Sequence, residues 1–106
     1  MKHPLLPLSE TMHYILLALK EPLHGYAIMT KIEQMSEGDV ILAAGTLYGA
    51  LDNLNKHGWI APVKGETGRR KVYQITEEGL SVLERERSRL QHILSLYEGD
   101  DIGEEI

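Results

Sequence analysis

Residues 58–79 constrain the fold of this chain more than any other segment. They begin with Gly-Trp-Ile and contain two short runs, 60–64 and 71–75, rich in the β-branched and aromatic residues that strands favour. Residues 65–70 between these runs include two glycines, which a tight hairpin turn favours. One helical pattern ends just before the hairpin and another begins just after it. The chain is therefore expected to fold as helices around a small antiparallel hairpin.

The turn of this hairpin is basic. The turn and its borders hold one acid, Glu66, against four cations: Lys64, Arg69, Arg70 and Lys71. Arginines on a turn suit contact with phosphate or with the minor groove of DNA, and an exposed hairpin with a solvated tip is the alternative explanation. A helix, a basic-tipped hairpin and a further helix, in this order, form the layout of a winged-helix DNA-binding domain. The four cations are thus candidate DNA-binding residues.

Apolar residues at spacings of three and four predict three helices before the hairpin. The first is expected to start at Ser9 as N-cap and to end before Pro22. The second follows a tight connection at residues 23–25 and is expected to end with Gly38 as its C-cap. The apolar residues 40–42 then predict either a minimal strand beside the hairpin or a buried loop.

The third predicted helix, residues 45–57, has an apolar inner face and a polar outer face, and Gly58 is expected to end it. The outer face is mostly small and poor in acids, so it suits the major groove. Its residues are Thr46, Gly49, Asn53 and Lys56, with Tyr48 beside them. Threonine and asparagine would read base edges, whereas Lys56 and the Tyr48 hydroxyl would bind phosphate. An ordinary solvated helix face is the alternative.

A fourth helix is predicted from residue 77, with Thr76 as N-cap and two glutamates that complement the helix dipole. Residues recurring at spacings of three and four form an apolar stripe interrupted by one arginine: Leu80, Leu83, Arg87, Leu90, Leu94 and Tyr97. Because the preceding residues already suffice for a small core, the stripe predicts that two such helices pair in a homodimer. Arg87 would then need an acid of the partner, Glu84 or Glu86. Packing of the stripe on the first helix is the alternative.

Composition bounds the architecture. The chain has 106 residues, 42% of them hydrophobic, which suffices for one small core. We expect an α+β, mainly α fold: a winged helix-turn-helix domain in residues 1–76, a C-terminal dimerisation helix in 77–98 and a flexible acidic tail in 99–106. The longest apolar run, residues 15–19, is far too short to span a bilayer, and the N-terminus lacks signal-peptide features. These features predict a cytoplasmic protein with no membrane segment.

The net charge of −5 conceals an uneven distribution. Residues 1–76 hold eight basic and seven acidic side chains, whereas residues 77–106 hold three and nine. The predicted DNA-binding part is therefore locally basic, and the local field steers a protein to phosphate more than the charge of the whole chain does. So small an excess predicts modest non-specific affinity and strong salt dependence.

No pattern in the chain indicates catalysis or a metal. There is no cysteine, and the five histidines show neither HxxxH nor HExxH spacing. No Ser/His/Asp order, glycine-rich phosphate loop or paired-carboxylate site occurs. We therefore expect neither an enzyme nor a cofactor. Two alternatives to DNA binding stay open: a winged helix used only for protein–protein contact, which the acidic net charge would suit, and a ligand-binding dimer without a DNA function.

In five places, spread over residues 10–98, the chain resembles the PadR family of transcriptional regulators. The matching segments are His24-Gly25-Tyr26, Gly45-Thr46-Leu47-Tyr48 with Ala50-Leu51, Leu54 followed by Gly58-Trp59-Ile60, Arg69-Arg70-Lys71-Val72-Tyr73, and Thr76-Glu77-Glu78-Gly79. The resemblance implies a homodimeric winged-helix repressor whose third helices enter successive major grooves of double-stranded DNA. It also implies that Tyr48 contacts phosphate, that Thr46 and Asn53 face the groove, and that residues 69–71 belong to the wing.

The resemblance further implies that a small phenolic or flat hydrophobic effector can relieve repression by binding between the C-terminal helices. Two departures from the family pattern matter here. Gly49 follows the tyrosine where many relatives carry proline or another residue, and it would allow close approach to DNA. The fourth helix has no tryptophan or phenylalanine, so Tyr14 and Tyr97 are the aromatic candidates for an effector cleft, whereas Trp59 is expected to pack on the core.

Overall fold

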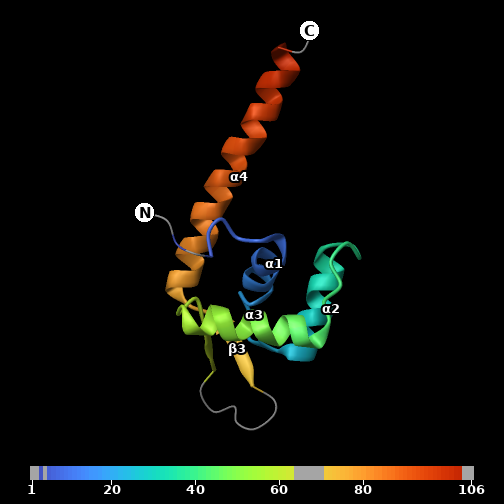
Figure 1. Ribbon diagram of the computed structural model, residues 1–106, viewed down its shortest axis with the longest axis vertical. Helices are drawn as coiled ribbons and strands as arrows, with labels where there is room; N and C mark the ends of the chain where they lie inside the picture. The colour runs from blue at the N-terminus through green and yellow to red at the C-terminus, as the bar shows by residue number, and fades with distance from the viewer. Residues whose placement is uncertain (1–2, 4, 64–70, 104–106) are drawn as a thin grey trace.

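A computed structural model describes residues 3, 5–63 and 71–103 of the chain (Figure 1). Its elements, in chain order, are α1 (Glu10–Ala18), β1 (Leu23–His24), α2 (Gly25–Met35), α3 (Ala44–Lys56), β2 (Ile60–Pro62), β3 (Val72–Ile75) and α4 (Glu77–Gly103). Four helices and one small antiparallel sheet confirm the predicted α+β, mainly α winged-helix fold. Helices α1 to α3 and the sheet form a body, from which α4 extends (Figure 1).

The predicted hairpin is confirmed, because β2 and β3 pair antiparallel with Ile60 opposite Ile75. A third strand completes the sheet in the order β1-β3-β2. This strand is β1, in the segment predicted to be only a tight connection. Residues 40–42, predicted as either a minimal strand or a buried loop, form no strand. The N–H of Val40 donates to the buried hydroxyl of Ser36 at 2.9 Å and is therefore unavailable to a neighbouring strand. Residues 40–42 instead form an irregular link in which Ile41 is exposed.

Two predicted helix ends are confirmed. The Ser9 hydroxyl accepts the N–H of Met12 at 3.1 Å and caps α1. Gly58 follows the C-cap of α3 with φ at 79°, a left-handed conformation that glycine adopts without steric cost. The N–H groups of Gly58 and Trp59 return to the carbonyls of the last turn, which satisfies the end of the helix.

The end of α2 differs from the prediction by one residue. The N–H of Gly38 donates to the Glu33 carbonyl at 2.9 Å, and the N–H of Glu37 donates to the Gln34 carbonyl at 3.1 Å. This pattern places Glu37, with φ at 54°, in the first left-handed position after the C-cap. Gly38, the predicted cap, is the second left-handed residue and continues the turn.

The core lies where α1, α2, α3, the sheet and the first turns of α4 meet. Trp59 is 2% exposed and packs in this core, as predicted. The other large buried apolar side chains come from every element except β1: Leu8, Ile15, Leu16, Leu19, Ile28, Ile32, Leu47, Leu51, Leu54, Ile60, Tyr73, Val82 and Leu83. Burial of these side chains supplies most of the stabilisation of a domain of this size.

The start of α4 is fixed to the end of α3. The Thr76 hydroxyl accepts the N–H of Gly79 at 3.0 Å, which confirms the predicted N-cap, and donates to the Gly58 carbonyl at 2.7 Å. Gly79 is packed so closely that a Cβ at this position would lie 2.2 Å from the carbonyl oxygen of Trp59. The helix that follows is therefore held by hydrogen bonds and by close backbone contact in its first turn.

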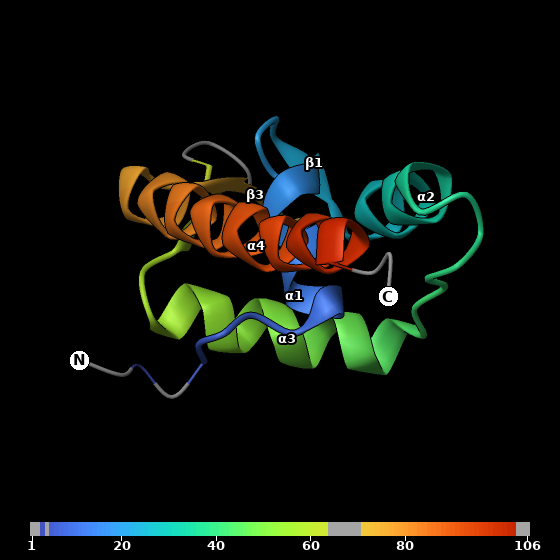
Figure 2. The ribbon, with the colours of Figure 1, turned by 90° about the horizontal axis from the view of Figure 1, so that it is seen from above.

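Helix α4 runs well past the body, and Figure 1 shows that the other helices lie beside only its beginning. Figure 2, seen from above, shows α4 and α3 crossing the view in a similar direction. Helix α4 continues to Gly103, five residues past the predicted end of the dimerisation helix at residue 98. Leu83 is 7% exposed and packs in the core of its own chain. Its assignment to a dimer stripe was therefore wrong, because this early turn of α4 still faces the body.

Candidate nucleic-acid interface

The polar side chains of α3 share one outward face. Leu47, Leu51 and Leu54 are buried on the opposite side of the helix, which fixes its rotation. The residues proposed from the sequence to meet DNA are all exposed: Thr46, Tyr48, Gly49, Asn53 and Lys56. Figure 1 places α3 at the end of the body from which β2 and β3 project, away from the free part of α4. The predicted recognition face and the hairpin thus lie at the same end of the molecule.

Tyr48 is held against the first turn of α2. A Cβ at Gly25 would lie 2.3 Å from the Tyr48 hydroxyl oxygen and 2.9 Å from the ring carbon that bears it. The phenol therefore rests on the bare backbone of Gly25 while 52% of the residue stays exposed. Because glycine has no side chain, position 25 leaves room for the Tyr48 ring between α2 and α3.

Tyr26 is a candidate contact residue that the sequence reasoning missed. It opens α2 next to Gly25 and is 72% exposed, the highest exposure among the large apolar and aromatic residues described. The His24-Gly25-Tyr26 segment, one of the matches to the family pattern, contains this tyrosine and could have indicated it. Tyr26 follows the glycine on which Tyr48 rests and presents an exposed hydroxyl. Hydroxyls of this kind donate to phosphate oxygens.

The hairpin is tied to α2 through β1. His24, the N-cap residue of α2, pairs with Val72 of β3, and the N–H of Val63 donates to the Val72 carbonyl at 2.8 Å. Lys71 is exposed at the start of this strand. The predicted wing residues Lys64, Arg69 and Arg70 lie outside the described residues. The strands that carry the wing are thus joined to the helices that carry Tyr26 and Tyr48.

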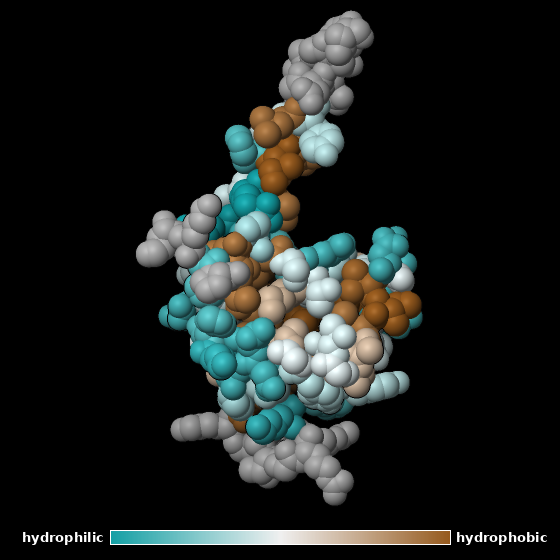
Figure 3. Space-filling model, in the orientation of Figure 1, coloured by the Kyte–Doolittle hydropathy of each residue, from teal (hydrophilic) through white to brown (hydrophobic). Residues whose placement is uncertain are grey.

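The exposed apolar side chains gather on α4. Six of the ten large exposed ones in the described part of the chain belong to this helix: Leu80, Leu90, Ile93, Leu94, Leu96 and Tyr97. Figure 3 shows apolar surface on the part of α4 that leaves the body. A cleft of about 550 Å³ between α1 and α4 contains five of the six predicted stripe residues: Leu80, Leu83, Arg87, Leu90 and Leu94. Exposed apolar surface of this extent is typical of an association site.

The two acids considered as partners of Arg87 differ in position. The Arg87 guanidinium lies 3.7 Å from Glu84 of its own chain, and both side chains are 68% exposed, so this pair contributes little. Glu86 is 2% exposed and engaged inside the protomer. It is therefore not a partner for Arg87 of a second chain, and that prediction was wrong.

The structure does not bring the two predicted effector tyrosines together. Tyr14 lines a cleft of about 460 Å³ whose other walls include Leu17, Arg89 and Leu90. Tyr97 is 66% exposed and does not line this cleft. Of the two, Tyr14 is the one that lines this cleft, where a small molecule could be held.

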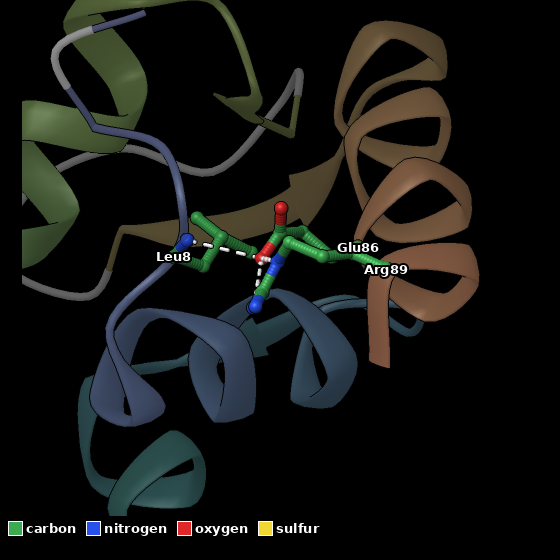
Figure 4. Close-up of polar contacts among 3 residues, drawn as sticks. All are labelled: Leu8, Glu86 and Arg89. Atoms are coloured by element: carbon green, nitrogen blue, oxygen red, sulfur yellow. Dashed lines mark hydrogen bonds and ion pairs between the residues drawn. The ribbon is translucent and has the colours of Figure 1, made fainter. Parts of the chain in front are cut away.

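Glu86 forms a buried polar cluster that the sequence did not reveal (Figure 4). One of its carboxylate oxygens accepts the N–H of Leu8 at 3.1 Å and two bonds from Arg89, from Nε at 3.1 Å and Nη2 at 2.8 Å. Burial raises the pKa of Glu86, but the hydrogen bonds from Arg89 and Leu8, with the charges of Arg89 and His13, outweigh it and lower the pKa below its ordinary value. The hydrogen bond to Glu86 in turn raises the pKa of Arg89.

Among the side chains that the structure describes, no cluster of three or more histidines, cysteines or acids could hold a metal ion. In residues 3, 5–63 and 71–103, no helix combines the length and the apolar character needed to cross a membrane.

Comparison with known proteins identifies the relatives of this fold. The model of the transcriptional regulator PadR-like family matches residues 15–85. The transcriptional regulator YqjI of Escherichia coli is 31% identical over 70 residues, which are 66% of this chain and 33% of that protein. The chain spans only 20% to 33% of the length of the curated relatives that it matches.

Solved structures agree with this match. A PadR family transcriptional regulator from Eggerthella lenta is 31% identical, with a TM-score of 0.65, over 87% of this chain and 80% of that one. Bacillus subtilis PadR in complex with operator DNA is 24% identical, with a TM-score of 0.63, over 74% of this chain and 47% of that one. The second likeness, at lower identity, bears on the fold alone.

Proposed function

The chain belongs to the PadR-like family of transcriptional regulators, and from this premise we propose that it is a homodimeric repressor that binds double-stranded DNA sequence-specifically. The observation that carries the proposal is the shared end of the molecule at which the polar face of α3 and the hairpin strands lie. A polar helix face of this kind fits a major groove, and a basic hairpin beside it fits the flanking backbone. The relative from Bacillus subtilis was solved with its operator DNA.

In this proposal the residues of the interface divide by chemistry. Thr46 and Asn53 face base edges, and Gly49 between them gives the backbone room to approach the DNA. Tyr48 and Lys56 bind phosphate, and we add Tyr26 to this group on the grounds of its exposure. The cations of the wing supply the remaining phosphate contacts: Lys64, Arg69, Arg70 and Lys71.

The dimer forms through α4. Leu90, Leu94 and Tyr97 are 44%, 57% and 66% exposed, and pairing with a second copy removes them from water. Because α4 projects from the body away from the hairpin, two chains joined there keep both α3 helices free for DNA. Two recognition helices read half-sites about 34 Å apart, one turn of the duplex.

A small hydrophobic or phenolic effector that relieves repression would bind between α1 and α4. The cleft lined by Tyr14 offers apolar walls and the guanidinium of Arg89, which suits a molecule with one anionic or hydroxyl group. This part of the proposal is supported by the chemistry of the cleft and is separable from DNA binding.

The test is fluorescence anisotropy with DNA from upstream of the protein's own gene, against scrambled DNA, over a series of salt concentrations. Preferential binding at physiological salt is expected, since base contacts add to the salt-sensitive phosphate contacts. Weak binding that ignores sequence and disappears with salt would favour the alternative, a winged helix that contacts other proteins. DNA selected from a random library then distinguishes a wrong choice of promoter from a missing activity.

A further inference from the structure

Glu86 marks the point at which α4 leaves the body. One turn earlier, Val82 and Leu83 are buried in the core. One turn later, Leu90 is 44% exposed, and the helix continues to Gly103. Glu86 itself is 2% exposed, and within the described part of the chain no other charged side chain is buried to this degree. The last buried side chain described in α4 is therefore an acid.

The contacts of Glu86 join two parts of the chain at this point, α4 and the segment that leads into α1. Its carboxylate accepts the N–H of Leu8, which directly precedes Ser9, the N-cap of α1. Arg89 of α4 donates two bonds to the same oxygen from the adjacent turn. In Figure 4 the chain at Leu8, the start of α1 and α4 converge on this carboxylate. The beginning of α1 is thus attached to α4 by directed hydrogen bonds.

A buried acid is not the most stabilising choice of residue for this junction. Buried ion pairs are often replaced by apolar residues of similar volume without loss of stability, because removing charges from water costs about as much as the pairing returns. What a carboxylate adds is direction, since the N–H of Leu8 can donate to it at only one rotation of α4, and Arg89 of the same helix holds the carboxylate in place. Packing of leucines alone would tolerate a range of rotations.

We propose that Glu86 is a positioning residue that fixes the direction of α4 relative to α1 and so sets the half-site spacing that the dimer accepts. The dimer surface at Leu90, Leu94 and Tyr97 lies beyond Glu86, whereas α3 lies in the body on the other side of it. A change of direction at Glu86 therefore moves the two recognition helices of a dimer relative to each other.

The leverage of this position is large. The 17 residues from Arg87 to Gly103 extend about 25 Å at about 1.5 Å per residue, so a swing of about 10° at Glu86 moves their far end by about 4 Å. This displacement compares with the rise of about 3.4 Å between successive base pairs. A change of about 10° in the direction of α4 is thus enough to weaken the preference of the dimer for one half-site spacing. The effect on half-site spacing rests on the proposed function, whereas the role of Glu86 in fixing the direction of α4 does not depend on it.

The direction of α4 is measured by the distance between two spin labels within one protomer. The chain has no cysteine, so Asn55→Cys on α3 and Ser95→Cys on α4, both exposed, give a single pair of sites. Labelled protein is diluted with unlabelled protein to remove distances between protomers. The parent is expected to give one narrow distribution, and Glu86→Gln a shifted or broader one. Glu84→Gln, an exposed neutralisation two residues away, is expected to match the parent.

A double variant keeps the test decisive even if Glu86→Gln fails to fold. Glu86→Met combined with Arg89→Met removes both charges and leaves neither unpaired, so it is expected to fold and yet to broaden the distribution. Unchanged distributions in Glu86→Gln and in the double variant would overturn the assignment of Glu86. Circular dichroism and thermal unfolding verify that each variant is folded.

The DNA consequence is tested with operators selected by the parent and then altered by one base pair between half-sites. The parent is expected to lose about tenfold in affinity, equivalent to about 1.4 kcal/mol, for each altered spacing. The double variant is expected to bind these spacings almost equally. An identical spacing profile in parent and double variant would overturn the DNA consequence. If the parent selects no DNA, the proposed function fails, while the label distances still decide the role of Glu86.

Discussion

The hydroxyl of Tyr48 occupies the space that a side chain at position 25 would need, because a Cβ on Gly25 would lie 2.3 Å from it. The atoms in the way belong to the far end of a side chain that is 52% exposed. They can therefore move out toward solvent without disturbing the core. The contact positions Tyr48 more than it stabilises the fold.

Gly25→Ala is accordingly expected to reduce DNA affinity more than stability. The methyl group displaces the phenol from its place between α2 and α3, and a lost charge-assisted bond to phosphate weakens binding by about 1.5 to 3 kcal/mol. The free energy of unfolding should fall by less than about 1 kcal/mol. Urea denaturation and anisotropy measure the two quantities. Gly45→Ala is the control for stability, since a Cβ there meets no atom within 4 Å. DNA affinity equal to that of the parent would contradict the role given to Tyr48.

Gly79→Ala should behave in the opposite way. Its Cβ would lie 2.2 Å from the carbonyl oxygen and 3.1 Å from the carbonyl carbon of Trp59, which are backbone atoms and cannot swing aside. Relief requires a shift of α4 against the end of α3, and overpacking of this kind costs about 1 to 3 kcal/mol. The midpoint of urea denaturation measures the loss. The control is Ser81→Ala, an exposed position in the same turn, which is expected to leave the midpoint nearly unchanged.

These contacts show which parts of the molecule the sequence could predict. The helices, the hairpin and the caps at Ser9, Gly58 and Thr76 follow from local patterns, and the structure agrees with them. The strand at residues 23–24 escaped prediction because a two-residue strand has no periodicity of its own and exists only through pairing with β3. The end of α2 was displaced by one residue because a glycine was preferred over Glu37 for a left-handed position.

The candidate site was predictable to a similar extent. The outward face of α3 follows from the spacing of its leucines, since their burial fixes the helix rotation. Tyr26 was missed because a single exposed side chain produces no pattern. Glu86 was missed because an acid in a charged run suggests solvent, and its burial depends on Leu8, 78 positions away in sequence. Only the assembled fold shows that contact.

The wing is expected to contribute through phosphate contacts. Arg69→Ala with Arg70→Ala should weaken DNA binding and lower the slope of log affinity against log salt by about 2, because each phosphate contact contributes a slope of about 0.9. Anisotropy at several salt concentrations gives both values. Lys20→Ala combined with Arg85→Ala, both exposed and outside the proposed interface, removes the same charge and controls for net charge. Parallel salt dependences for the parent and the arginine variant would remove the wing from the mechanism.

The dimer is expected to depend on the free part of α4. Leu90→Asp places a charge within the exposed apolar surface, and burying it against a second copy would cost more than the contact returns. Light scattering should therefore report a monomer. Ser88→Asp adds the same charge two residues away, on roughly the opposite side of the helix, and should remain dimeric. A dimer mass for Leu90→Asp would place the interface elsewhere.

Acid should remove the stabilisation that Glu86 provides. Burial opposes ionisation, but Arg89 and the Leu8 N–H, together with the charges of Arg89 on α4 and His13 on α1, hold the pKa of Glu86 below its ordinary value of 4.5. A carboxyl whose pKa is lowered on folding stabilises the protein above its unfolded pKa and loses this effect as the pH falls through its folded pKa.

The free energy of unfolding of Glu86→Gln should therefore lie about 1 to 3 kcal/mol below that of the parent at pH 7, toward the lower figure because the Arg89 side chain is 35% exposed and is solvated once released. The parent and Glu86→Gln should converge as the pH falls from 4.5 through the lower pKa that Glu86 has in the folded protein, because the folded parent then acquires a neutral carboxyl at this position. Urea denaturation from neutral pH into this acid range measures the difference. Glu84→Gln, exposed on the same helix, should differ from the parent by less than about 0.5 kcal/mol at pH 7. A difference between Glu86→Gln and the parent that stays constant with pH would show that shape, and not charge, makes Glu86 necessary at this junction.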